Sequence, residues 1–190
     1  KDTSGVLLLV KNDEFASFAI NEFKKMKVEK IYVTAVRGIM SEEVVVNEPI
    51  LTIKNKNGAF SKISKDGKEA ISEISPLMVV GKKTLVKVAI KTGRTHQIRV
   101  HLASINRHIL GDDLYGFKSQ GDKISRVMLH AYMLYFIHPR TGKRVEFTAK
   151  TYDDFNQIIY KKIPKEIFDE KICPTHIDTI FSSFLSGMRL

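Results

Sequence analysis

Apolar and polar residues alternate along much of this chain with the period of a β-strand. Residues 30–38 place Ile31, Val33 and Ala35 on one face and end at a glycine, which predicts a strand. Residues 6–10 are apolar without interruption, which predicts a strand covered on both faces. The same reasoning predicts extended segments at residues 44–53, 70–80 and 84–91, a polar loop or hairpin at 55–70, and a strand at 126–139 that turns into a hairpin through 138–149.

Helical spacing of apolar residues appears at fewer places. Asn12 or Asp13 can cap a helix that runs to about Met26 and carries one apolar stripe. Gly93 breaks the preceding strand, and Thr95 can cap a short second helix. The pattern therefore predicts an α+β fold whose mixed, mostly antiparallel sheet is flanked by helices.

The residue pattern changes near residue 150, from strand-like alternation to helical spacing. Residues 1–150 fit one domain, and residues 151–190 predict one or two short helices that form a C-terminal extension. A chain of 190 residues can bury roughly 70% of its unfolded surface, so it can form a stable core without disulfide bonds. Cys173 is the single cysteine, which excludes an intrachain disulfide and indicates a reducing, cytoplasmic compartment.

Charge narrows the choice of partner. The formal net charge is +10, and the stretch from Ile74 to Gly111 contains no Asp or Glu. The cations in this stretch are Lys82, Lys83, Lys87, Lys91, Arg94, Arg99 and Arg107. Such a segment can steer a polyanion, so nucleic acid is the expected partner, and a solvated basic face is the alternative. No apolar run approaches the ~20 residues that span a bilayer, so we expect no membrane partner.

The stretch "GRTHQIRVHL" contains two arginines with different surroundings. Arg94 precedes the predicted helix, where its side chain and the first N–H groups could hold a phosphate. Arg99 lies between apolar neighbours and is expected to be half-buried, and a half-buried guanidinium needs a carboxylate. A purely structural ion pair is the alternative to a functional role for Arg99.

Metal and cofactor motifs are absent from the sequence. His96 and His101 are five residues apart rather than four, and no HExxH motif is present. Cys173 and His176 lack a second pair of ligands, and there is no Walker loop or GxGxxG motif. We therefore expect no metal site.

Five segments resemble, in order, those of the RluA/RluD-type family of RNA pseudouridine synthases. They are "DTSGVLLLVKN", "KIYVTAVRG", "GKEAISEI", "TGRTHQIRVHLASINRHILGDDLYG" and "MLHAYMLYFIHPRTGKRVEFTA". The resemblance covers residues 1 to about 149 and implies the pseudouridine synthase fold without its N-terminal part. It also implies the reaction: the N1–C1′ bond of a uridine in RNA breaks, the uracil turns, and C5 bonds to C1′ without a cofactor or metal.

The resemblance further implies roles for individual residues. The family's reactive aspartate lies in an Arg-Leu-Asp-x-x-Thr-Ser-Gly motif whose threonine is Thr3 here, so the aspartate is expected immediately before Lys1. Asp2 falls on a variable place of the motif and is expected in a turn or cap. An arginine at position 99 pairs with the reactive aspartate. The remaining implied site residues are Tyr32, which packs against the base and assists removal of the C5 proton, Leu129, which lines the base pocket, and Arg94, Lys91 and His96, which lie near RNA phosphates.

Together these observations predict an N-terminally incomplete catalytic domain that is inactive by itself. The parent protein is expected to isomerise specific uridines in structured RNA, with ribosomal RNA a more common target in this family than transfer RNA. A non-catalytic RNA-binding module with the same fold is the alternative, and the residue before Lys1 distinguishes the two. Tyr32 as an ordinary sheet aromatic is the alternative to its catalytic role. Nothing in the sequence indicates an oligomeric state.

Overall fold

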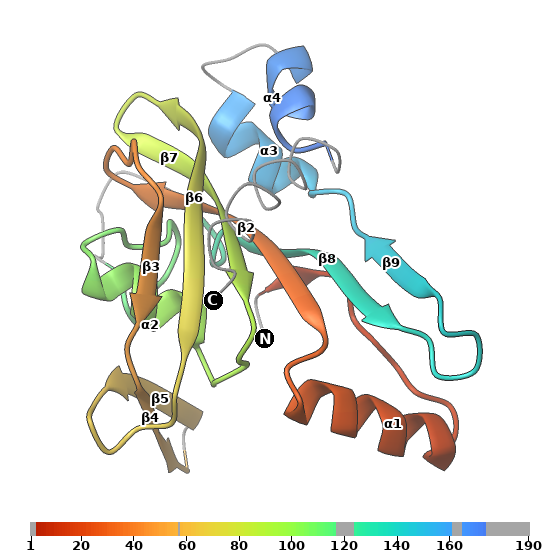
Figure 1. Cartoon of the computed structure of the whole chain (residues 1–190). Coiled ribbons are helices and arrows are strands. Elements are labelled where there is room, and N and C mark those ends of the chain that lie inside the picture. Colours follow the sequence, from red (N-terminus) through yellow and green to blue (C-terminus); the bar gives the residue numbers. More distant parts are fainter. Residues whose placement is uncertain (1–2, 57, 117–123, 161–164, 174–190) are drawn as a thin grey trace.

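A seven-stranded sheet forms the centre of the computed structural model, which describes residues 3–56, 58–116, 124–160 and 165–173 (Figure 1). Its strands are β1 (Ser4–Gly5), β2 (Glu29–Arg37), β3 (Val44–Asn47), β6 (Ile71–Val80), β7 (Lys83–Ile90), β8 (Leu129–Ile137) and β9 (Arg144–Thr148). They follow the order β1-β8-β2-β7-β6-β3, with β9 also paired to β8. Every pairing is antiparallel except the short parallel one between β1 and β8.

The remaining elements flank this sheet. Strands β4 (Ile50–Asn55) and β5 (Gly58–Ile63) form a separate two-stranded hairpin. The helices are α1 (Asp13–Lys24), α2 (Gln97–Ser104), α3 (Asp153–Tyr160) and α4 (Lys165–Lys171). Figure 1 shows α1 below β2 and β8, and α3 with α4 together at the opposite end of the molecule. The predicted α+β fold with a mostly antiparallel sheet is confirmed.

Strand β7 shows where the core lies. Its residues 84–90 are all buried, so both faces of the sheet are covered at this strand. Leu85 from β7, Leu102 from α2 and Phe155 from α3 join one hydrophobic cluster, and each is fully buried. Ile172 belongs to the same cluster, so the described residues after position 150 pack onto the sheet. Residues 161–164 and 174–190 of the predicted C-terminal extension lie outside the described residues, as does Asp2.

The expected strand at residues 6–10 is wrong. Pairing with β8 ends after Gly5, although the Val6 N–H still donates to the carbonyl oxygen of Ala131 at 2.8 Å. From Met133 onward the same edge of β8 is occupied by β9, so residues 6–10 have no strand to pair with. Only alternate side chains therefore pack inward, and Leu7 and Leu9 remain 79% and 77% exposed.

Helix α1 begins as the sequence predicts. The Asn12 side chain accepts a hydrogen bond from the Phe15 N–H at 2.8 Å, which satisfies one of the first N–H groups of the helix. Phe15 and Phe18 pack with Phe136 and other residues in a second small cluster. None of the helices in the described part of the chain has the length and the apolar character that crossing a membrane would require.

The expected cap of α2 is wrong. The helix begins at Gln97, and His96 takes the cap position with a left-handed backbone, φ 56°. No side chain caps the helix start in the usual way. Thr95 therefore lies outside the helix, and Arg99 lies in its first turn.

Candidate active site

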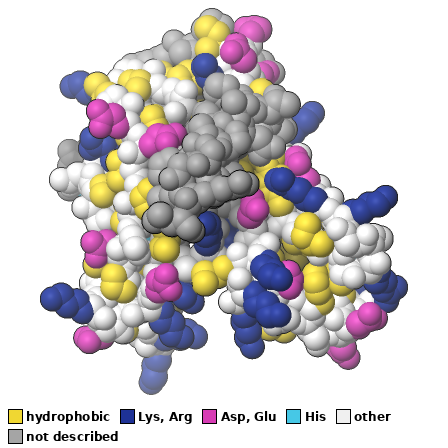
Figure 2. Space-filling model, viewed as in Figure 1, with side chains coloured by type: hydrophobic (Ala, Val, Ile, Leu, Met, Phe, Trp, Pro, Cys, Tyr) yellow, Lys and Arg dark blue, Asp and Glu magenta, His cyan; other side chains and the backbone are white. Residues whose placement is uncertain are grey.

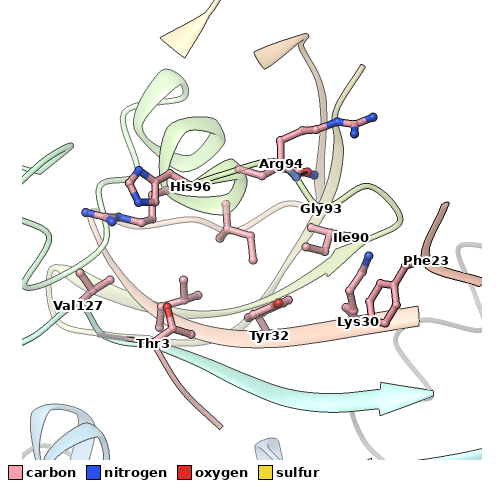
Figure 3. A pocket seen from close by; sticks show the side chains of 13 residues that line it. Thr3, Phe23, Lys30, Tyr32, Ile90, Gly93, Arg94, His96 and Val127 are labelled. Atoms are coloured by element: carbon pink, nitrogen blue, oxygen red, sulfur yellow. Dashed lines mark hydrogen bonds between the residues drawn. The ribbon is translucent and has the colours of Figure 1, made fainter. Parts of the chain in front are cut away.

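A pocket of about 440 Å³ opens between β2, the start of α2 and the N-terminal segment (Figure 3). Pockets that bind small molecules commonly have volumes of about 300–1,000 Å³. Its lining includes Thr3, Tyr32, Arg99 and Leu129, which come from four segments far apart in the sequence. The structure therefore gathers in one pocket the threonine of the family motif and three positions that the resemblance assigns to the site.

Arg99 lines the pocket and forms an ion pair with Asp112, which does not line it. The Arg99 Nε donates to Asp112 Oδ2 at 2.8 Å, and Nη2 donates to Oδ1 at 2.6 Å. The side chain of Asp112 is 1% exposed and that of Arg99 is 16% exposed. The half-buried guanidinium thus has the carboxylate partner that its burial requires, but the partner follows it in the sequence by thirteen residues.

Asp112 is held by its own loop as well as by Arg99. Its Oδ1 accepts hydrogen bonds from the backbone N–H groups of Leu114 and Tyr115, each at 3.0 Å. Burial by itself would raise the pKa of Asp112, but the hydrogen bonds from Arg99 and from these N–H groups outweigh burial and place the pKa below its ordinary value. Asp112 is therefore ionised at neutral pH and fixes the orientation of Arg99.

Tyr115 connects this ion pair to strand β5 and to His96. Its ring lies 5.0 Å from the Arg99 guanidinium carbon and stacks on Phe60 of β5 with centroids 5.3 Å apart. Its hydroxyl oxygen accepts from the Ser61 N–H at 2.8 Å and lies 2.9 Å from His96 Nδ1. Burial, followed by the nearby Arg99 charge, lowers the pKa of His96 below its ordinary value. His96 is therefore mostly neutral at pH 7.

Gln97 orients the turn that carries Arg94. Its side-chain oxygen accepts from the Arg94 N–H at 3.0 Å and from the Thr92 hydroxyl at 2.9 Å. Its amide nitrogen donates to the Ile71 carbonyl at 2.8 Å and to the Ser72 hydroxyl at 3.1 Å. All four interactions are made by a residue that is 2% exposed, so Gln97 ties the start of α2 to β6.

His101 completes this anchor one turn later. Its Nε2 lies 2.9 Å from the Glu48 carbonyl oxygen, which can only accept, so Nε2 carries the proton. Its Nδ1 then accepts from the Ser72 hydroxyl at 2.9 Å. Burial lowers the pKa of His101, in agreement with a neutral ring that is fully buried. Gln97 and His101 thus fix the helix that carries Arg99, and Gln97 also fixes the preceding turn that carries Arg94.

Arg94 lines the pocket, but its head group turns outward. The Nε donates to the Glu69 carbonyl at 2.8 Å, and Figure 3 shows the guanidinium extending away from Tyr32 toward the rim. The lysine at position 91 is exposed and does not line this pocket. Its carbonyl oxygen instead accepts from the Lys30 Nζ at 3.0 Å. Lys91 thus lies outside the pocket that Arg94 and His96 line, and Lys30 is added to that lining.

Lys30 is a pocket residue that sequence reasoning missed. It lies on β2 two residues before Tyr32, and its ammonium lies 5.4 Å from the centroid of the Phe23 ring. Burial, and secondarily the charge of Arg94, lowers the pKa of Lys30 to about 8. Two-residue spacing from Tyr32 places both side chains on one face of the strand, and this spacing is the signal that could have identified it.

Tyr32 is half-buried and reaches the pocket from β2. The pairing of β2 with β8 shifts register between Ile31 and Tyr32, where β8 carries one extra residue, Tyr132, while β2 itself keeps its register with β7. Burial raises the pKa of Tyr32, so its phenol is protonated at neutral pH. The ring can therefore pack against a flat ligand while its hydroxyl remains a hydrogen-bond donor. Leu129, 5% exposed, adds an apolar wall.

The seven cations of residues 74–111 do not form a single basic face. Lys87 is 2% exposed within β7, and Arg99 is paired with Asp112. On the face shown in Figure 2, Lys and Arg side chains lie on both sides of a hollow between the β4–β5 hairpin and α1. The positive charge near the pocket therefore comes from several segments, including ones that the charge count along the sequence did not single out. Among the described residues, no group of three or more His, Cys, Asp or Glu side chains is arranged to hold a metal ion.

Asp112 and Tyr115 are the other functional candidates that sequence reasoning missed. Both belong to the stretch "LGDDLYG", which the sequence pattern identified only as a loop. Its two adjacent aspartates and one tyrosine in a short turn were the available signal, but the pattern does not say which aspartate is buried.

A family model described as RNA pseudouridylate synthase matches residues 1–104, which is more than half of the chain. A Helicobacter pylori protein named as an uncharacterized RNA pseudouridine synthase is 56% identical over 135 residues, covering 70% of this chain and 54% of that protein. The ribosomal large subunit pseudouridine synthase C of Buchnera aphidicola is 35% identical over 157 residues, covering 78% of this chain and 50% of that protein.

A solved structure shows the same arrangement of elements. The human RNA pseudouridylate synthase domain containing 1 protein superposes with a TM-score of 0.66 at 28% identity, covering 79% of this chain and 65% of that one. This chain spans about half the length of the curated relatives it matches. From the family model, these relatives and the shared fold, the chain belongs to the RNA pseudouridylate synthase family, the RluA-type group that its five ordered segments resemble.

Proposed function

We propose that the intact protein isomerises uridine to pseudouridine within structured RNA. The observation that carries the proposal is the single pocket that brings together Thr3, Tyr32, Arg99 and Leu129. These are the motif threonine and the three residues that the family resemblance assigns to catalysis and base binding. Residues 1–150 form the catalytic domain in this proposal, and residues 151–190 form its C-terminal extension.

Arg99 has the electrostatic role. The reactive aspartate of the family motif lies three residues before Thr3, and it must be ionised to act. A fixed cation nearby lowers the pKa of a carboxyl group by about 1–3 units. Asp112 holds the Arg99 guanidinium in one orientation at the pocket wall, so this cation does not have to be ordered when RNA binds.

Tyr32 and Leu129 receive the base. A uridine must leave its stack at a cost of a few kcal/mol, which packing against an aromatic ring and contacts to phosphates can offset. The N1–C1′ bond then breaks, the uracil turns, and the C5–C1′ bond forms. C5 loses its proton and N1 takes one up, so the product is a neutral isomer. In this proposal Tyr32 packs against the base and assists removal of the C5 proton.

Arg94, Lys91 and His96 are the proposed contacts to the RNA backbone, and Lys30 joins them from the pocket wall. The position of Arg94 at the rim and of Lys30 beside Tyr32 supports this role. Because the pKa of Lys30 is about 8, its ammonium carries most of its charge at pH 7 and loses it in mildly alkaline solution. RNA affinity should therefore fall between about pH 7 and pH 9 in the wild type, and Lys30→Met should remove most of this dependence.

Ribosomal RNA is the proposed substrate, and the cytoplasm is the proposed compartment. The name of the Buchnera relative, a ribosomal large subunit pseudouridine synthase, supports this choice over transfer RNA. Mapping of pseudouridines in RNA from cells with and without the intact protein tests it. The proposal requires that a ribosomal site lose its pseudouridine, and loss confined to transfer RNA would contradict the choice of substrate.

Release of tritium from C5-labelled uridine in RNA tests the reaction itself. We expect Tyr32→Phe to lower kcat by at least about 100-fold while RNA affinity stays within twofold, because the ring remains and only the hydroxyl is removed. Residues 1–190 alone should release no tritium, since the motif places the reactive aspartate immediately before Lys1. An intact protein that binds RNA and releases no tritium would instead be a non-catalytic RNA-binding module.

A further inference from the structure

A chain of hydrogen bonds joins the C-terminal helices to the N-terminal segment beside the pocket. Asp154, in the first turn of α3, binds Arg126 through two contacts: Nε to Oδ2 at 2.6 Å and Nη2 to Oδ1 at 2.9 Å. The Arg126 Nη1 donates to the hydroxyl oxygen of Ser4 at 3.3 Å. Arg126 thus links helix α3, through Asp154, to Ser4 near the beginning of the sequence.

His130 continues the chain on the far side of Ser4. Its Nε2 lies 2.9 Å from the Ala149 carbonyl oxygen, which accepts only, so Nε2 carries the proton. Its Nδ1 therefore accepts from the Ser4 hydroxyl at 2.8 Å. His130 is fully buried, which makes this tautomer the one that leaves no ring nitrogen unsatisfied. Every donor and acceptor in the chain is then matched from Arg126 to Ala149.

The backbone pairing of the segment held by this chain is short. Strand β1 is two residues long and pairs only with His130 and Ala131 of β8. A strand pairing this short is not stable by itself. Thr3 precedes it and lines the pocket, while the Ser4 side chain is held by Arg126 and His130. The hydrogen-bond chain therefore holds in place the backbone from which Thr3 reaches the pocket.

We propose that Ser4, Arg126, His130 and Asp154 are positioning residues for the reactive segment, and that α3 serves the reaction through them. This inference rests on the proposed function, because the family's reactive aspartate lies three residues before Thr3 on that segment. A misplacement of about 1 Å at a reacting group can cost about 100-fold in rate, so loosening the anchor should affect turnover before it affects the fold.

An ordinary surface ion pair would behave differently. The Asp154 side chain is 44% exposed and that of Arg126 is 17% exposed. Exposed ion pairs contribute typically 0–1 kcal/mol to stability. If Asp154 only stabilised the fold, its substitution would therefore change both stability and turnover very little, as substitution of any exposed pair would.

The experiment uses the intact protein with Asp154→Asn, Arg126→Gln and the conservative variant Asp154→Glu. Asparagine keeps a side-chain oxygen for the start of α3, so the helix should remain formed. The matched control is Glu14→Gln, which breaks an exposed ion pair with Arg140. The Glu14 side chain is 75% exposed and that of Arg140 is 70% exposed. Two readouts are taken: kcat and KM for uridine conversion, and hydrogen exchange of the Val6 amide, which is bonded to Ala131.

We expect Asp154→Asn and Arg126→Gln to lower kcat by about 10-fold, with KM within twofold, and to speed Val6 exchange by about the same factor. Asp154→Glu should keep kcat and the Val6 exchange rate close to those of the wild type, because the carboxylate is retained. Glu14→Gln should change neither kcat nor the Val6 exchange rate. A kcat and a Val6 exchange rate both within twofold of the wild type in Asp154→Asn and Arg126→Gln would overturn the inference. Absence of conversion by the unaltered protein would overturn the proposed function itself, while Val6 exchange would still show whether the segment is anchored.

Discussion

Replacement of Asp112 by asparagine removes the carboxylate that holds Arg99. Asparagine offers one acceptor oxygen where the structure has four donors, from Arg99 and from two backbone N–H groups, directed at two carboxylate oxygens. Breaking a buried ion pair by removing one partner costs about 3–5 kcal/mol. Because the Arg99 side chain retains 16% exposure toward the pocket, we expect the lower end, about 3 kcal/mol. For a chain of this length that is a decrease in Tm of about 6–12 °C.

Urea denaturation followed by circular dichroism measures this cost. The matched control is Asp113→Asn, the exposed neighbour, which should change the free energy of unfolding by less than about 0.5 kcal/mol. The pKa of Asp112 lies below its ordinary value, so its contribution is complete above about pH 4 and is lost as the pH falls through the folded-state pKa. The difference between wild type and Asp112→Asn should therefore shrink in acid. A loss below about 1 kcal/mol at pH 7 would refute the reasoning.

Three further predictions concern the framework around the pocket. Gln97→Leu leaves several buried donors and acceptors without partners and should cost about 2–4 kcal/mol in urea denaturation, and a loss below about 1 kcal/mol would contradict this role. Burial holds the pKa values of His101 and His130 below 6.5, so the unfolded state binds more protons in mild acid. The contribution of the two neutral histidines to stability should be complete above about pH 6.5 and should be lost as the pH falls through their folded-state pKa values. Urea midpoints that do not change between about pH 5 and pH 8 would exclude this contribution. Gly5→Ala places a Cβ in a steric clash with the Ala131 carbonyl oxygen at φ +113°, whereas Gly58→Ala has φ +138° and open space around it. The first substitution should cost at least about 2 kcal/mol more than the second, and equal costs in urea denaturation would show that the close approach is unimportant.

Elements with a clear period could be predicted from the sequence. The strand that carries Tyr32, the two long strands β6 and β7, the hairpin β8–β9 and the capped helix α1 all appear where the pattern indicates them. Their burial is set by side chains two or four residues apart, which the sequence displays directly. The ordered segments also identified the family, and with it the pocket residues Tyr32, Arg99 and Leu129.

Competition between distant segments was decided only by the tertiary structure. Residues 6–10 have the composition of a strand, but β9 occupies the edge of β8 that they would need. Thr95 has the chemistry of a cap, yet the side chain of Gln97 takes the Arg94 N–H and ties the turn to β6. In both cases the local preference is real, and a partner far away in sequence offers a more stable arrangement.

The choice of ionic partners was likewise beyond the sequence. Burial of Arg99 requires a carboxylate, but the requirement does not say that Asp112 rather than Asp113 turns inward. Lys30 enters the pocket wall and Lys91 does not, because strand pairing rather than position in a basic stretch decides which side chain faces the cavity. Sequence determined which kinds of groups this protein must bring together, and packing of the sheet against its helices determined which individual residues meet, because Coulomb and hydrogen-bond energies depend on distances that only the folded chain defines.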